Sequence, residues 1–98
     1  MNERIQSLTK HRAILFADVQ AKASRLSIPA YICELYDLPP GATIQLSVER
    51  RGQVFEGPFA MSSGYEIVPK EQDRRLRKIL KPGTRVKVTV APIAASRI

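Results

Sequence analysis

The chain has 98 residues, of which 44% are hydrophobic, enough for one domain with a single core but too few for two. One cysteine, one histidine and no tryptophan exclude a disulfide scaffold and a metal site built from clustered Cys and His ligands. No stretch approaches the ~18 apolar residues of a membrane span, and the polar start lacks the apolar centre of a signal peptide. We therefore expect a soluble, cytoplasmic protein with no membrane partner.

The formal net charge of +7 is distributed unevenly along the chain. Residues 1–49 hold five basic and five acidic side chains, whereas residues 50–98 hold eleven basic and four acidic ones. Eight of those eleven fall between Lys70 and Lys87. This asymmetry favours a polyanionic partner, such as nucleic acid or an acidic protein. A generally basic, solvated surface is the alternative.

The first half of the chain predicts two strands, a helix and a third strand, in that order. Residues 1–12 show no apolar periodicity and are interpreted as a flexible or weakly helical arm. The apolar run 13–19 suits a buried strand, although a helical turn fits it as well. A brief strand over 24–29 ends at a proline that can open a helix over 30–38, which Pro-Pro-Gly stops. Residues 43–49 alternate strictly between apolar and polar and predict a strand.

The second half begins with a hairpin and then repeats the same order of elements. An Arg-Arg-Gly turn leads into a partner strand over 54–61. A short strand over 65–69 follows, then a helix over 70–80 that a second Pro-Gly stops. Residues 84–91 alternate like the last strand of the first half, and 92–98 form a loose tail.

The two halves resemble each other in sequence. Residues 26–29 align with 66–69 at an offset of 40, and the Pro-Gly pairs at 40–41 and 82–83 align at an offset of 42. A second helix two residues longer than the first accounts for the difference. Neither half could bury its apolar face alone, so the two should pack about a pseudo-twofold axis.

The predicted fold is therefore mostly β with two short helices. We expect one domain over 13–91, a small barrel built from two pseudo-symmetric βαβ-like halves at 13–49 and 54–91.

The segment SRLSIPAYICELYDLPPGATIQLSV, residues 24–48, resembles the AbrB, MazE and SpoVT group of swapped-hairpin barrels. The segment YEIVPKEQDRRLRKILKPGTRVKVTV, residues 65–90, looks like a diverged second copy. Two units in one chain resemble the arrangement of MraZ-type regulators and of small uncharacterised bacterial barrel domains. The resemblance implies an AbrB-like or double-psi-like barrel that binds DNA as a transcription regulator or an antitoxin. Single-unit members of the group need a second chain, whereas a chain with both units can be a monomer or a homodimer.

The family's DNA-binding members have an Arg before the Ile-Pro strand, and Arg25 fills that place in the first half. Tyr65 occupies it in the second half. The Arg pair of the family's helix falls on Cys33 and Glu34 in the first half, so it is absent there. Asp73 and Arg74 occupy its places in the second half.

The second helix has one basic face. At 100° per residue, its apolar side chains fall opposite a stripe of cations, and two further cations follow on the outward positions of the last strand. The candidate phosphate-binding residues are Lys70, Arg74, Arg75, Arg77, Lys78, Lys81, Arg85 and Lys87. The candidates for contact with base edges are Arg25, Arg50 and Arg51, the last two at the hairpin tip.

Two alternatives to DNA binding stay open. The basic helix face can be an ordinary solvated surface, or the barrel can be a non-enzymatic interaction module that binds RNA or an acidic protein.

Other residues predict little chemistry. Cys33 is interpreted as a small buried or half-buried side chain and His11 as a solvated one. Five aromatic residues are spaced like core or barrel-end packing, with base stacking as the lesser alternative: Phe16, Tyr31, Tyr36, Phe55 and Phe59. No pattern indicates an enzyme, a cofactor or a metal.

Overall fold

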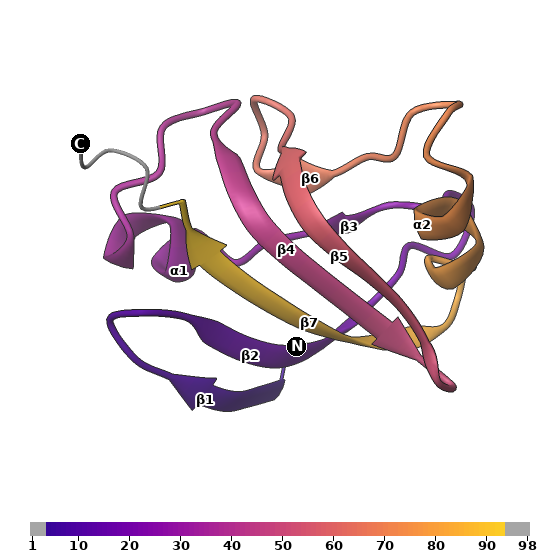
Figure 1. The fold of residues 1–98 in the computed structure, drawn as a ribbon, viewed down its shortest axis with the longest axis horizontal. Coiled ribbons are helices and arrows are strands. Elements are labelled where there is room, and N and C mark those ends of the chain that lie inside the picture. The colour runs from indigo at the N-terminus through magenta and orange to yellow at the C-terminus, as the bar shows by residue number, and fades with distance from the viewer. Residues whose placement is uncertain (1–3, 94–98) are drawn as a thin grey trace.

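The computed structural model describes residues 4–93 and contains seven strands and two short helices over this range (Figure 1). In chain order they are β1 (Arg4–Leu8), β2 (Ala13–Asp18), β3 (Leu26–Ser27), α1 (Ala30–Leu35), β4 (Thr43–Arg50), β5 (Gln53–Ala60), β6 (Glu66–Ile67), α2 (Arg74–Ile79) and β7 (Arg85–Pro92). The fold is mostly β with two short helices, as predicted. Over the described range neither helix, at six residues each, is long enough to cross a membrane.

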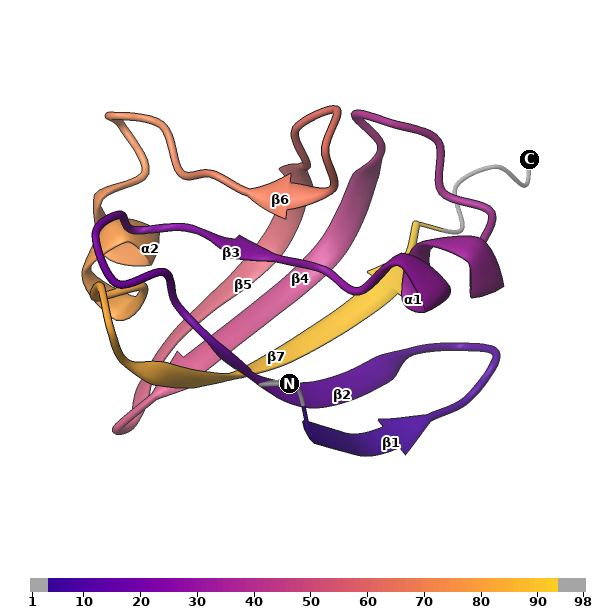
Figure 2. The same ribbon diagram turned by 180° about the vertical axis from the view of Figure 1, so that it is seen from behind.

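The strands form two antiparallel sheets. Five strands pair in the order β1-β2-β7-β4-β5, and β3 pairs with β6 in a separate two-stranded sheet. Figure 2 shows the small sheet lying across one face of the large one. Hydrogen bonds within residues 4–93 do not close the large sheet on itself, because β1 and β5 form its two edges. The structure therefore shows two facing sheets and no continuous hydrogen-bonded barrel.

The order of elements repeats along the chain. The run β2-β3-α1-β4 is followed by β5-β6-α2-β7, and the pairings match when the two runs are exchanged. The pair β2–β7 then corresponds to β5–β4, while β4 and β7 pair with each other, as do β3 and β6. The sequence repeat thus corresponds to a repeat of structure.

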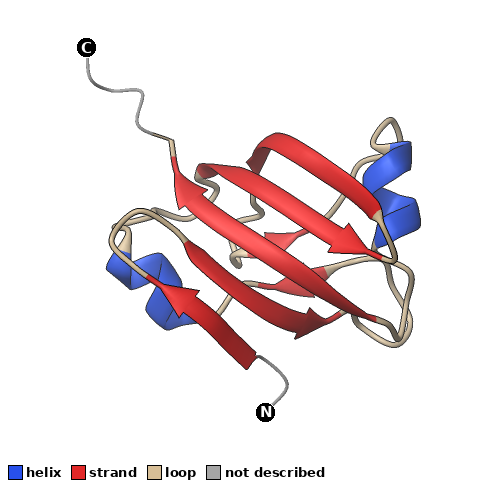
Figure 3. Cartoon of the chain, turned by 60° about the horizontal axis from the view of Figure 1, so that its bottom comes forward, coloured by secondary structure: helices blue, strands red, loops and turns tan. Residues whose placement is uncertain are grey.

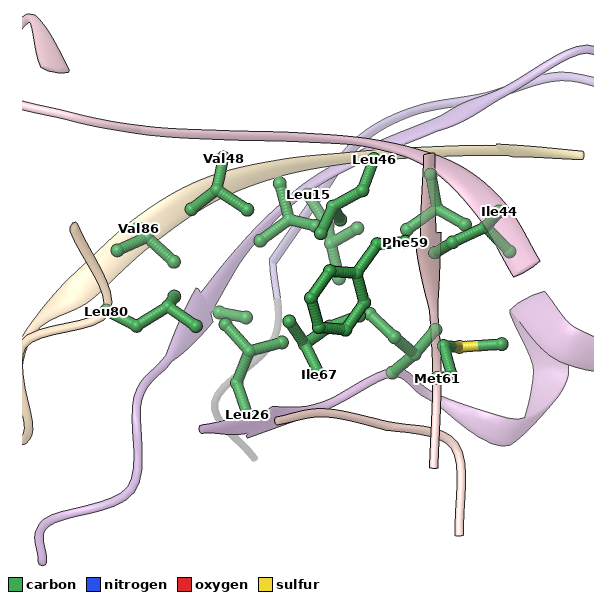
Figure 4. Packing of buried hydrophobic residues seen from close by; sticks show 14 of the residues in the cluster. Leu15, Leu26, Ile44, Leu46, Val48, Phe59, Met61, Ile67, Leu80 and Val86 are labelled. Atoms are coloured by element: carbon green, nitrogen blue, oxygen red, sulfur yellow. The ribbon is translucent and has the colours of Figure 1, made fainter. Parts of the chain in front are cut away.

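The core lies between the two sheets (Figure 4). Alternation places Ile44, Leu46 and Val48 of β4 on the inner face of the large sheet, because successive strand side chains point to opposite faces. Leu26 and Ile67 face them from the small sheet, and both are fully buried. Twenty buried apolar residues belong to this one cluster, so the described chain has a single core, as one domain requires.

The structure corrects the prediction for the N-terminal arm. Residues 4–8, expected to be flexible or weakly helical, form β1, which pairs with β2 at the edge of the large sheet. The strand escaped prediction because an edge strand buries little apolar surface and shows no clean alternation. Residues 1–3 of the expected arm lie outside the described range, as do 94–98 of the expected tail. Pro92, placed in that tail, is the last residue of β7.

Both helices are shorter than predicted. The first ends at Leu35 instead of residue 38, and both have six residues, so the second is not two residues longer than the first. Residues 70–73 form a separate turn, in which the Asp73 N–H donates to the Lys70 carbonyl at 2.9 Å and an Asp73 carboxylate oxygen accepts from the Lys70 N–H at 2.9 Å. Asp side chains that bond nearby backbone groups compete with helix formation in this way. After the helix, Lys81 lies in a turn, and its carbonyl accepts hydrogen bonds from the N–H and the hydroxyl of Thr84. Lys70 and Lys81 therefore flank α2 instead of belonging to it.

Candidate nucleic-acid interface

The second helix, the β4–β5 turn and the start of β7 meet at one end of the molecule, while α1 lies at the other (Figures 1 and 3). We call the first of these the basic end. It holds most of the cations that the sequence singled out, arranged around three depressions of the surface.

Arg50 joins the hairpin to α2. Its Nε donates to the carbonyl of Ile79 at 3.0 Å, and Nη2 donates to the carbonyl of Lys78 at 3.3 Å. The last carbonyls of a helix have no partner within the helix, and a guanidinium there also complements the helix dipole. Arg50, expected to contact base edges, therefore has its guanidinium bonded to the end of α2.

Arg50→Ala is expected to lower the free energy of unfolding by about 1–2 kcal/mol, since two charge-assisted hydrogen bonds to helix carbonyls are lost. Urea unfolding followed by circular dichroism measures the change. Arg51→Ala is the matched control, because no hydrogen bond or ion pair joins the Arg51 side chain to the described residues. Equal stabilities of the two variants would contradict the capping role of Arg50.

Arg51 projects from the tip of the hairpin. Arg51 and Gly52 have φ values of 53° and 80°, the left-handed pair of a two-residue type I′ turn, whose twist matches that of the flanking strands. The Arg51 side chain is exposed. Of the three candidates for base contacts, Arg51 is therefore the one held at a tip that can enter a groove.

The first depression lies between α2 and the start of β5. It has a volume of about 660 Å³ and is lined by Gly52, Gln53, Val54, Arg74, Arg75, Lys78 and Ile79. Three cations line this depression. One of them, Arg75, is held beside β5, because its Nη1 donates to the Val54 carbonyl at 3.3 Å. No carboxylate lines this depression among residues 4–93, so its charge is positive throughout.

The second depression lies where β2, β7 and β4 meet the hairpin turn. It has a volume of about 400 Å³ and is lined by Phe16, Glu49, Arg50, Arg51, Thr84, Arg85 and Lys87. Arg85 Nε lies 3.5 Å from an Asp18 carboxylate oxygen across the β2–β7 pair. Cations and an aromatic ring thus share one concave surface, with Glu49 as the acidic residue of its lining.

The third depression lies on another side of α2, against the loop that precedes β3. Lys22, Arg25 and Arg77 supply its charge, and Pro69 and Pro82 are among its other lining residues. Arg25 Nε donates to Gln20 Oε1 at 3.2 Å, and its Nη1 lies 3.9 Å from Glu66 Oε1. Arg25 is therefore held away from the hairpin tip.

The structure divides the predicted stripe. Arg74, Arg75 and Lys78 share the first depression, whereas Arg77 belongs to the third and Lys70 and Lys81 line none of the three. Within the described range, two of the predicted cations form ion pairs with carboxylates, namely Arg25 and Arg85.

Two residues of these surfaces were missed from the sequence. Lys22 lies in a loop, where no periodicity indicates which way a side chain points. Phe16 carries a signal in its parity, since Ala13, Leu15 and Ala17 are buried and Phe16 alternates with them. The spacing of the aromatic residues nevertheless favours core or barrel-end packing for this ring.

The remaining candidates show no site chemistry. Cys33 is buried, as predicted; burial, and to a lesser extent the negative charge of Glu34, raises the pKa of its thiol, so the reactive thiolate is disfavoured. The Tyr36 hydroxyl donates to the Thr9 carbonyl at 2.7 Å and has its pKa raised by burial. His11 is exposed. Over residues 4–93 no three His, Cys, Asp or Glu side chains are grouped as a metal site would need.

No protein-family model matches the chain, and no curated protein sequence does either. Among solved structures, the solution structure of PHS018 from Pyrococcus horikoshii is similar, with a TM-score of 0.56 and 17% sequence identity. The match covers 88% of this chain and 94% of that one. At this identity the likeness concerns the fold alone.

Proposed function

We propose that the protein binds duplex DNA through its basic end. The observation that carries the proposal is the gathering of Arg74, Arg75 and Lys78 in one depression beside the hairpin tip. Several cations on one accessible surface can neutralise neighbouring phosphates and release their counterions, which is the main source of affinity for DNA.

The hairpin offers a route for reading the bases. A two-stranded ribbon fits the major groove, which is about 12 Å wide, and an arginine can donate two hydrogen bonds to guanine there. In the proposed complex α2 faces the phosphate backbone and Arg51 enters the groove. Arg50 would support this geometry indirectly, since it holds the hairpin against α2.

The resemblance to AbrB, MazE and SpoVT proteins supports the same proposal and suggests a transcription regulator or an antitoxin, acting in the cytoplasm without catalysis. We propose that the two halves form a small pseudo-symmetric barrel closed by side-chain packing between the sheets. The repeated element order and the exchangeable strand pairings support this description.

The alternative partners are RNA and an acidic protein. The third depression is the observation that favours these alternatives, because it adds positive charge on a different side of α2, from Lys22, Arg25 and Arg77. Such a spread suits a partner that wraps around the basic end.

Parallel titrations test the proposal. Duplex DNA, structured RNA and an acidic polypeptide are titrated against the labelled protein at two salt concentrations. We expect the tightest binding to duplex DNA, with log K falling by roughly 0.9 per contacted phosphate for each unit of log salt. Binding to the polypeptide in preference to both nucleic acids would overturn the proposal, and preference for RNA would replace DNA by RNA.

A further inference from the structure

Phe16 lies on the outer face of the five-stranded sheet, away from the core. Its neighbours in β2, Leu15 and Ala17, are buried on the inner face, whereas Phe16 is half-buried and does not belong to the core cluster or pack against it. By contrast, Phe55 and Phe59 contact each other edge to face at 6.5 Å and belong to the core or pack on it. The core therefore does not explain an aromatic ring at position 16.

Cations line the depression that contains this ring. Lys87 of β7 is the direct cross-strand partner of Phe16, and Glu49 of β4 is the partner of Lys87 on the other side. Side chains directly opposite each other share a face, with Cβ atoms about 4.5–5.5 Å apart. Arg51 and Arg85 also line the depression. Its volume of about 400 Å³ falls within the roughly 300–1,000 Å³ of small-molecule sites.

A half-buried aromatic ring that shares a depression with cations has the chemistry of a site for an unpaired nucleotide. Bases of single strands stack on aromatic side chains while basic residues follow the backbone. In duplex DNA the faces of the bases are covered by their neighbours, so a ring on a sheet cannot reach them. Glu49, which lines the same depression from β4, two strands away from Phe16, adds an acceptor for an exocyclic amino group.

We propose that the depression at Phe16 binds a nucleotide of a single-stranded segment. The base stacks on Phe16, Lys87 and Arg51 contact the adjoining phosphates, and Glu49 accepts from the base edge. The proposal rests on the nucleic-acid binding proposed above and adds a site for unpaired bases at one defined surface.

Phe16→Trp provides the first test. The chain has no tryptophan, so emission from this variant reports on this site alone. An oligonucleotide that stacks on the indole is expected to quench its fluorescence. Inorganic polyphosphate, which carries charge but no base, is expected to leave the fluorescence unchanged at the same ionic strength.

Phe16→Leu provides the second test, through the anisotropy of labelled oligonucleotides. Loss of one stacked base is expected to weaken binding of a single-stranded oligonucleotide by about 5- to 150-fold, with binding of duplex DNA unchanged. Ile14→Leu is the matched control, because Ile14 lies on the same face of β2, two residues away, and does not line the depression. Melting temperatures of both variants show whether either change acts through stability.

The outcomes separate this inference from the proposed function. If Phe16→Leu binds single strands as tightly as the wild type, or polyphosphate quenches Phe16→Trp as strongly as the oligonucleotide does, the stacking site is wrong while duplex binding stands. If the wild type binds neither single strands nor duplex at low salt, both proposals fail. If Phe16→Trp does not fold, the comparison of Phe16→Leu with Ile14→Leu decides.

Discussion

The double variant Arg74→Glu and Lys78→Glu is expected to lose roughly 100-fold or more of its affinity for duplex DNA at low salt, because two phosphate contacts are replaced by repulsion. The salt dependence carries the sharper signal. Two lost contacts should make the slope of log K against log salt shallower by about 1.8. Anisotropy titrations over a series of salt concentrations measure both quantities.

The control for this experiment has the same net charge as the Arg74→Glu and Lys78→Glu double variant. Lys10→Glu with Arg12→Glu also lowers the formal net charge from +7 by two for each substitution, that is to +3. These two residues are exposed in the β1–β2 loop, which the bond from Tyr36 to Thr9 ties to the α1 end. The control is expected to retain the wild-type slope. Equal losses in both double variants would mean that net charge alone, and no surface at α2, determines binding.

Ile67→Ala is expected to lower the free energy of unfolding by about 2–5 kcal/mol. Ile67 is fully buried in β6, a strand of two residues whose partner Leu26 is also fully buried. The small sheet joins the two halves across the core, and so short a pair can hardly close the cavity that the lost side chain leaves. A domain of this size has roughly 5–15 kcal/mol of stability, so the loss is a large part of the total.

Thermal and urea unfolding measure this effect, with an expected fall in melting temperature of roughly 4–8 °C per kcal/mol. Ile67→Val should cost about 0.5–1.5 kcal/mol. Val68→Ala, at an adjacent side chain that is 37% exposed, should change stability little. If Val68→Ala is as damaging as Ile67→Ala, the small sheet does not cover the core in the way described.

Local pattern sufficed for most of the fold. Strict alternation predicted β4 and β7 almost to the residue, and the Arg-Arg-Gly turn predicted the hairpin between β4 and β5. The repeat of these signals predicted two similar halves. The prediction for the arm was wrong because β1 forms by pairing with β2. Nothing within residues 1–12 indicates that partner.

The candidate site was predicted less completely. Clustering of positive charge in the second half was evident, and three of the cations do share a depression. A helical wheel also places Arg77 and Lys70 in the same stripe, but Asp73 closes a separate turn over residues 70–73, so Lys70 lies outside the helix. The role of Arg50 at the end of α2 was not foreseeable, because the two partners are 29 residues apart in sequence.

The amino-acid sequence by itself determined the strands other than β1, the presence of both helices and the turns, since each depends on residues a few positions apart. It also determined the excess of positive charge. Only the tertiary structure decided which cations share a surface and that Phe16 stands among them on the outside of the sheet. The physical reason is that strand register and the contact between α2 and the hairpin depend on residues far apart in the sequence. Both are determined by burial of one common core and by hydrogen bonds between distant segments.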